Sequence, residues 1–364
     1  MITVTAFHIW CLMILGSSCS NEDLLEENVG NSMDPSTDHD GDGYPFSEDC
    51  DDVDASVNPG VPFTCVWSKL PVCERVHEDL FSASAMEPPS ANSNAYVVPE
   101  AVLRENLALS IQAALDGNAD ESIHHATLAD YNVCAEGSLL LWSPPAGSGS
   151  AHLALRTHPD AIDLIIQTPH SFYDLGTREE GLFLFQQSDA RALLSSGTHR
   201  CASDRSSNCS GETKVCTVFS SEPFRISDMA HTDTSFFHTA HIALADGLPS
   251  TTILQLHMFL DPGASVSNGK KRNTTADQPS ARFAEALTEA FPNEFITSCN
   301  DYGAGNEADR TCGTSNTQGR HLNGSDDACG ESPSEVSGRF IHLEQNVSVI
   351  NQADKVAEAI ENTF

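Results

Sequence analysis

Three short apolar runs in the C-terminal two-thirds of the chain each end on a side chain that can bind a metal ion or move a proton. They are residues 165–170, 253–257 and 340–344, and they end at His170, His257 and Glu344. Runs of this length are typical of buried strands, and in open α/β sheets the reactive groups lie just past the carboxyl ends of the strands. Two neutral imidazoles and a carboxylate can therefore meet at one sheet edge. That is the layout of a catalytic zinc site, in which one position stays open for water and a separate carboxylate is the general base.

The turn after the first run supplies a further ligand. It reads HSFYDLGT from His170 to Thr177. A histidine followed within a few residues by a carboxylate, between a strand and a helix, can present both groups to one zinc ion. Asp174 is the first candidate for this carboxylate. Glu179 and Glu180, at the start of the next predicted helix, are the alternatives.

These motifs resemble a family of zinc enzymes. The His-x3-Asp-x-Gly-Thr turn, the strand-end His257 and Glu344 on the last strand are similar to the zinc-dependent poly-γ-glutamate hydrolases. More distantly they resemble zinc carboxypeptidases and N-acetylmuramoyl-L-alanine amidases, which share that α/β fold. The resemblance covers roughly residues 160–350, although the turn is shorter than in the hydrolases and carries Asp in place of Glu. It implies that His170, Asp174 and His257 bind zinc and that Glu344 activates water, and the amidases imply Glu179 or Glu180 in place of Asp174.

Other polar residues are expected around this site as second-shell or substrate-binding groups. Helix-borne histidines more often orient ligands or line a pocket than bind the metal themselves. An arginine suits a substrate carboxylate, because its planar fork can bind both oxygens. The candidates are His199, Arg200, His231, His238, His241 and Arg320.

Strand and helix patterns alternate through residues 95–364. This alternation predicts an α/β domain with a mostly parallel sheet and helices on both faces. A hairpin is expected from 138–142 and 151–156. Strands are expected at 161–169, 190–196, 251–257, 294–298 and 339–344, and helices at 98–115, 178–188, 232–246, 279–291 and 352–362.

The N-terminal segment is typical of an exported chain. An apolar stretch from Phe7 to Leu15 is too short to span a bilayer and reads as a signal peptide, residues 1–19. Small residues before Cys19 resemble a bacterial lipobox, which predicts that Cys19 is lipidated; an ordinary secretory signal cleaved nearby is the alternative. Residues 20–36 are polar and acidic and predict a disordered tether.

An acidic motif at residues 37–62 predicts calcium binding. Carboxylates at positions one, three, five and twelve, with glycine at six, have the spacing of a calcium loop. Pro45 prevents a regular helix from continuing out of the loop, so the motif resembles the Asp-rich repeats of thrombospondin type 3 more than an EF-hand. A solvated acidic linker without an ion is the alternative. The candidate ligands are Asp38, Asp40, Asp42, Asp49, Asp51 and Asp54. Residues 63–94 are expected to be a cysteine-containing linker.

Cysteine content and charge narrow the class of protein. After removal of Cys11 with the signal and acylation of Cys19, the remaining ten of 12 cysteines permit five disulfides, which favours an oxidising compartment. The net charge of −34 excludes nucleic acid as a partner and leaves a lipid anchor as the only expected membrane contact. We therefore expect an exported, monomeric zinc hydrolase that cleaves an amide bond. The alternative is a non-catalytic calcium-binding surface lipoprotein; a serine esterase lacks its Gly-x-Ser-x-Gly elbow.

Overall fold

The computed structural model describes residues 36–45, 47–48, 55, 67, 70–74, 77–217, 220–271 and 274–364. The predicted signal peptide with Cys19, nearly all of the predicted tether, and the candidate calcium ligands Asp49, Asp51 and Asp54 lie outside these residues. No helix among the described residues is long and apolar enough to cross a membrane.

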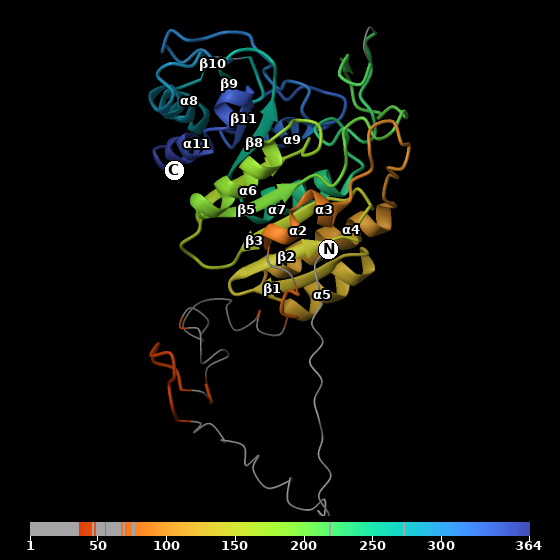
Figure 1. Ribbon diagram of the computed structural model, residues 1–364, viewed down its shortest axis with the longest axis vertical. Coiled ribbons are helices and arrows are strands. Elements are labelled where there is room, and N and C mark those ends of the chain that lie inside the picture. The colour runs from red at the N-terminus through yellow and green to blue at the C-terminus, as the bar shows by residue number, and fades with distance from the viewer. Residues whose placement is uncertain are drawn as a thin grey trace, which may run out of the picture.

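A nine-stranded sheet forms the centre of the protein, and helices cover both of its faces (Figure 1). The four middle strands, β5-β4-β8-β11, are parallel to one another, and they hold the predicted site. In spatial order the strands are β1 (Asn132–Glu136), β2 (Leu139–Ser143), β3 (His152–Arg156), β5 (Ala190–Ser195), β4 (Ile162–Thr168), β8 (Thr252–Met258), β11 (Phe340–Gln345), β9 (Ala264–Ser267) and β10 (Ile296–Ser298). The predicted α/β class with a parallel sheet centre is confirmed.

Antiparallel strands extend the sheet on both sides. β1, β2 and β3 form a meander that joins β5, and β9 runs antiparallel to β11. The hairpin of β2 and β3 was predicted, whereas β1 and β9 were not. β9 reads ASVS and is too short and too polar to give an apolar run, so its pairing with β11 is a tertiary effect.

The helices form two layers on the sheet. Strand side chains alternate between two apolar clusters, as the period of a strand requires: Ile165 and Ile253 belong to one cluster, and Ile166 and Leu254 to the other. The first cluster packs against α4 (Ala101–Leu115), α5 (Ala119–Leu128) and α7 (Phe236–Gly247). The second packs against α6 (Thr177–Gln187), α8 (Pro279–Ala290) and α11 (Ala353–Glu361). The remaining elements are α2 (His77–Leu80), α3 (Ala83–Met86), α9 (Thr317–Leu322), α10 (Val347–Ile350), β6 (Glu212–Thr213) and β7 (Glu222–Pro223).

Part of the predicted linker packs on this domain. Phe81 and Met86 are buried, and the backbone amides of Asn92 and Asn94 donate hydrogen bonds to carbonyls of residues 201 and 202. The described residues of 77–94 are therefore folded against the α/β unit, unlike the linker expected from their composition.

Four disulfides join described residues. They are Cys73–Cys134, Cys201–Cys216, Cys209–Cys329 and Cys299–Cys312. Cys50 and Cys65, the other two cysteines of the predicted set of ten, lie outside the described residues. These bonds fit a protein of an oxidising compartment.

Candidate functional site

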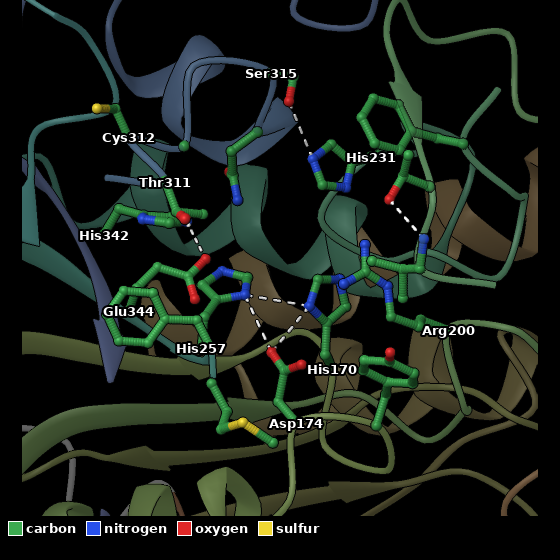
Figure 2. Close-up of a pocket in the computed structure, with 18 of the residues that line it drawn as sticks. His170, Asp174, Arg200, His231, His257, Thr311, Cys312, Ser315, His342 and Glu344 are labelled. Carbon is green, nitrogen blue, oxygen red and sulfur yellow. Dashed lines mark hydrogen bonds and ion pairs between the residues drawn. The ribbon is translucent and has the colours of Figure 1, made fainter. Parts of the chain in front are cut away.

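The carboxyl ends of three adjacent parallel strands bring the predicted ligands together (Figure 2). His170 follows β4 in the turn before α6, His257 lies near the end of β8, and Glu344 lies near the end of β11. Glu344 is the direct register partner of His257. Residues separated by about 90 positions in the chain therefore share one sheet edge, as the strand pattern predicted.

The turn after β4 holds Asp174 against His170. The amides of Tyr173 and Asp174 both donate to the carbonyl of His170, at 2.8 and 2.9 Å. Gly176 then enters α6 with φ of 91°, and a Cβ there would lie 2.8 Å from the side chain of Ile350. Only glycine combines this left-handed backbone with so close an approach, so the HSFYDLGT pattern produces one specific turn.

Three ligand atoms converge at this point. His170 Nδ1 lies 3.1 Å from Asp174 Oδ2, His257 Nδ1 lies 3.1 Å from His170 Nδ1, and His257 Nδ1 lies 3.3 Å from Asp174 Oδ2. All three side chains are almost completely buried. Buried polar atoms are normally satisfied by partners, and a triangle of two nitrogens and a carboxylate oxygen is typical of a metal site.

The outer nitrogens of both imidazoles fix which ring atom faces the triangle. His170 Nε2 lies 2.8 Å from Asp228 Oδ1, and His257 Nε2 lies 2.9 Å from Gln255 Oε1. Both acceptors are oxygens that cannot donate, so each Nε2 carries the proton and each neutral Nδ1 presents a lone pair. Oxygen acceptors behind metal-binding histidines orient them in this way.

Burial and charge set the protonation of these groups. Burial would raise the pKa of Asp174, but the charge and hydrogen bond of His170 together with those of His257 hold it below its ordinary value. Burial lowers the pKa of His257 from 6.5 to about 4, so this ring is neutral near pH 7. For His170, burial and Arg200 lower the pKa, yet Asp228 and Asp174 leave it above 6.5. Protons therefore compete with a metal ion for the imidazole nitrogen mainly at His170.

Glu344 lies beside the triangle and not in it. Its carboxylate is buried, and Figure 2 shows it next to His257 at the left of the cavity. Burial and the charge of Asp174 raise its pKa well above the ordinary value, although Arg200 acts in the opposite sense. A raised pKa is the direction that suits a carboxylate which accepts a proton and returns it near neutral pH.

His342 is a site residue that the sequence analysis missed. It lies two residues before Glu344, its ring centroid is 4.5 Å from that of His257, and its Nε2 is 3.8 Å from Glu344 Oε1. His257, His342 and Glu344 form a second group of possible ligands. Alternation along β11 puts residues 342 and 344 on one face, and this signal in FIHLE could have identified His342.

Neither alternative carboxylate reaches the triangle. Glu179 is exposed and pairs with Arg178. Glu180 is buried, but its Oε2 accepts a hydrogen bond from Gln345, and it does not line the cavity. Of the three carboxylates considered from the sequence, the structure places Asp174 alone beside His170 and His257.

Asp228 is the second residue that the sequence analysis did not identify as part of the site. It is 1% exposed and accepts hydrogen bonds from His170, from Arg200 Nε at 3.2 Å and from His231 Nδ1 at 2.9 Å. Arg200 and His231 therefore contact His170 through Asp228. His199 is half-buried, and its ring packs edge-on against Tyr173 without lining the cavity.

His238 and His241 lie behind the site in a buried network of glutamines. Gln255, which accepts from His257, donates to Gln167 at 3.0 Å, and Gln167 Nε2 lies 3.0 Å from His241 Nδ1. Gln318 Nε2 lies 3.2 Å from His238 Nδ1. The two histidines are thus connected to His257 only through amide side chains.

Arg320 does not bind the site. Its guanidinium donates to the carbonyls of Thr314 and Cys329 and to the hydroxyl of Ser210, at 3.0 to 3.1 Å, and it does not line the cavity. This corrects the substrate-binding role expected from its place in a polar, glycine-containing stretch. Two of its partners, Ser210 and Cys329, lie on chain segments that the Cys209–Cys329 disulfide joins.

A cavity of about 630 Å³ opens above the triangle and Glu344. This volume is that of a small-molecule or peptide-residue site. Apolar and polar side chains both line it. The lining residues are His170, Tyr173, Asp174, Arg200, Glu212, Thr213, Val215, Phe224, His231, His257, Met258, Phe259, Leu260, Thr311, Cys312, Gly313, Thr314, Ser315, Asn316, His342 and Glu344.

The described part of the acidic motif forms a tight loop. Oxygens of Asp38, Asp40 and Asp42 lie within 4.8 Å of one another. The amides of Gly41 and Gly43 donate to Asp38 at 2.7 and 2.9 Å. These contacts orient three of the predicted calcium ligands toward one another, and calcium binding stays a prediction.

Comparison with known proteins finds only distant similarity. No protein-family model matches the chain, and no curated protein matches it. A crystal structure of a “putative metallopeptidase” from Shewanella amazonensis SB2B is 12% identical, with a TM-score of 0.32, and the match covers 72% of this chain and 92% of that one. A gene product of Agrobacterium tumefaciens is 13% identical, with a TM-score of 0.29, over 55% of this chain and 85% of that one. At these TM-scores, neither similarity carries weight for the activity.

Proposed function

We propose that the protein is a zinc-dependent hydrolase that cleaves an amide bond. The observation that carries this proposal is the triangle of His170 Nδ1, His257 Nδ1 and Asp174 Oδ2, with both Nε2 atoms held by oxygen acceptors. Two histidines that only packed in a core would have no reason to direct both Nδ1 atoms toward the same carboxylate oxygen of Asp174. A shared metal cation accounts for this arrangement.

The dimensions of the triangle fit zinc. Zinc bonds of 2.0–2.1 Å to nitrogen and oxygen in a tetrahedron place neighbouring ligand atoms about 3.3 Å apart. The three edges measured here are 3.1, 3.1 and 3.3 Å. Two imidazoles and one carboxylate also suit zinc better than calcium, which prefers six or more oxygens. Three protein ligands would leave zinc a further position for water.

When bound, zinc would supply a Lewis acid that polarises a substrate carbonyl and makes water a better nucleophile near pH 7. The residues of the chain supply the remaining functions. Glu344 accepts the proton of the attacking water on its carboxylate and returns it to the leaving amine. Asp228 and Gln255 keep the two imidazoles in the tautomer that binds a cation.

Features outside the site agree with an enzyme that acts outside the cytoplasm. We propose that the chain is exported, acts as a monomer and is held at the membrane by lipid on Cys19, with Asp38, Asp40 and Asp42 binding calcium outside the catalytic unit. The four disulfides support export. They do not bear on the anchor.

Metal content tests the proposal first. The full mature chain, purified without chelator, should contain about one zinc ion, and His170→Ala or His257→Ala should lose both zinc and activity. His199→Ala is the matched control, because His199 is near the site but neither lines the cavity nor belongs to the triangle. Full zinc occupancy in His257→Ala would exclude the proposed ligand set.

Activity tests the base. Glu344→Gln preserves the size of the side chain but cannot accept a proton, so zinc content should be unchanged while amide hydrolysis falls by about 10²–10⁴-fold. The assay is amine release from peptide, γ-glutamyl and cell-wall amides. If the zinc-loaded wild type cleaves none of these, the protein is a binding module and not a hydrolase.

A further inference from the structure

The charges around the cavity bear on which amides can enter it. Besides the ligand Asp174 and the base Glu344, a third carboxylate, Glu212, lines the cavity. Among the described lining residues, Arg200 is the only lysine or arginine. Its guanidinium is already bound to Asp228 through Nε and Nη2. The described lining residues therefore hold no lysine or arginine without an opposite charge already paired to it.

Two disulfide bonds hold the segment that carries Glu212 at the cavity. Glu212 lies in β6, between two cysteines that are fixed by the bonds Cys209–Cys329 and Cys201–Cys216. The ring of Phe224 packs on His231, with centroids 3.7 Å apart, and a Cβ at Gly211 would lie 2.4 Å from that ring. The segment that carries Glu212 is thereby packed against Phe224, which stacks on His231, and His231 in turn contacts Asp228.

The carboxylate of Glu212 is exposed and is not neutralised nearby. No described residue forms an ion pair with it. Arg225, which follows β7, is bound to Glu222 at 2.9 Å. Lys214, on the same segment, is exposed and does not line the cavity. Glu212 therefore adds a negative charge without an ion pair to the wall of the cavity.

We propose, on the basis of the proposed function, that the substrates are amides with a cationic group close to the scissile bond and that Glu212 selects this group. Uncharged neighbours are tolerated, whereas anionic chains such as γ-linked polyglutamate are excluded. Glu212 carries an exposed charge without an ion pair and repels an anion at close range, whereas the charge of Asp174 would be compensated by the zinc ion; the net charge of −34 repels an anion at long range. A substrate amine or guanidinium is attracted both by the carboxylate of Glu212 and by the negative net charge of the protein.

The test is the cleavage profile of the zinc-loaded full mature chain. The probe is a mixture of N-acetylated, C-amidated peptides with randomised sequence, with poly-γ-glutamate as a separate substrate, and the products are sequenced by mass spectrometry. We expect lysine or arginine to be enriched beside the cleaved bonds and aspartate or glutamate to be depleted about tenfold or more. Poly-γ-glutamate should not be cleaved.

Glu212 variants assign the selection to this residue. For a lysine-flanked peptide, Glu212→Gln should raise KM about two- to fivefold with little change in kcat, as expected for one exposed ion pair. Glu212→Lys should invert the preference. The effect should shrink in high salt because the pair is exposed. Glu289→Gln removes the same charge from the solvent-exposed side of α8 and should leave the profile unchanged.

The outcomes separate this inference from the proposed function. Cleavage of acidic peptides or poly-γ-glutamate as fast as of lysine-flanked peptides would overturn the inference and leave the hydrolase intact. The same holds if both Glu212 variants keep the wild-type profile. If no amide is cleaved, the proposed function fails and the inference fails with it.

Discussion

Replacement of Asp228 by Asn tests the tautomer argument directly. Asp228 Oδ1 accepts from His170 Nε2, and Oδ2 accepts from Arg200. An asparagine has one acceptor and one donor group in these places. Arg200 is always protonated and only donates, so the amide oxygen is expected to face Arg200 and the amide NH₂ to face His170. His170 Nε2 must then accept, which moves the ring proton to Nδ1, the atom that belongs to the triangle.

The size of the effect follows from these contacts. Loss of an outer hydrogen-bond partner typically weakens metal affinity by about 10- to 100-fold, and inversion of the tautomer places Asp228→Asn at the upper end of that range. The buried charge of Arg200 also loses its opposite charge, although the amide oxygen still accepts a hydrogen bond from it. That loss is expected to lower the free energy of unfolding by about 3–5 kcal/mol.

The assay is zinc competition against a chromophoric chelator, with the fold checked by circular dichroism. Asp233→Asn removes the same charge from an exposed position nearby and should bind zinc like the wild type. The double variant Arg200→Gln with Asp228→Asn provides the rescue. The glutamine can accept from the asparagine NH₂, which returns the amide oxygen to His170, so zinc affinity should partly recover.

Two results would refute this reasoning. One is a folded Asp228→Asn protein that binds zinc with wild-type affinity. The other is a double variant that binds zinc no better than the single variant, because its defect would then come from lost charge and not from the tautomer.

Three further predictions concern stability and the second metal. Burial lowers the pKa of His152 from 6.5 to about 4, so the unfolded chain takes up a proton before the folded chain does, and the stability contribution present above pH 6.5 is lost as pH falls toward 4. Acidification from pH 7.5 to 4.5 with chelator present should therefore cost the wild type about 2 to 3 kcal/mol more than His152→Gln in denaturant titrations; equal losses would contradict this. Arg320→Gln should lower the free energy of unfolding by about 2–4 kcal/mol without changing KM, whereas a raised KM at full stability would restore the substrate-binding role. Conversion of Asp38, Asp40 and Asp42 to Asn should abolish the heat of calcium binding measured by calorimetry, and retained heat would place the calcium site elsewhere.

The elements of the site were predictable because each has a local signal. Buried parallel strands are short apolar runs, and their order along the chain was enough to place His170, His257 and Glu344 at one edge. The turn from His170 to Gly176 carries its own chemistry, since backbone bonds and a left-handed glycine define it. The α/β class followed from the same alternation.

Choices among residues of similar type needed the tertiary structure. Asp174, Glu179 and Glu180 are equally good ligands by composition, and only the direction of the turn and the start of α6 decide that Asp174 faces the histidines. Arg320 looked like a substrate ligand until its guanidinium was seen to bind backbone carbonyls. Such contacts depend on packing between distant segments, which no local pattern encodes.

By itself, the sequence determined the central parallel strands, the reactive groups that end them, and that the chain is strongly acidic and rich in cysteine. Only the tertiary structure decided how those groups are used. Asp228 enters the site from a loop without periodicity, and His342 enters it from the same strand as Glu344. Asp228 also pairs with Arg200, the one arginine among the described residues that line the cavity. The physical reason is that hydrogen-bond partners and charge compensation are set by distances in space, whereas periodicity in a sequence reports only which side of an element a residue occupies.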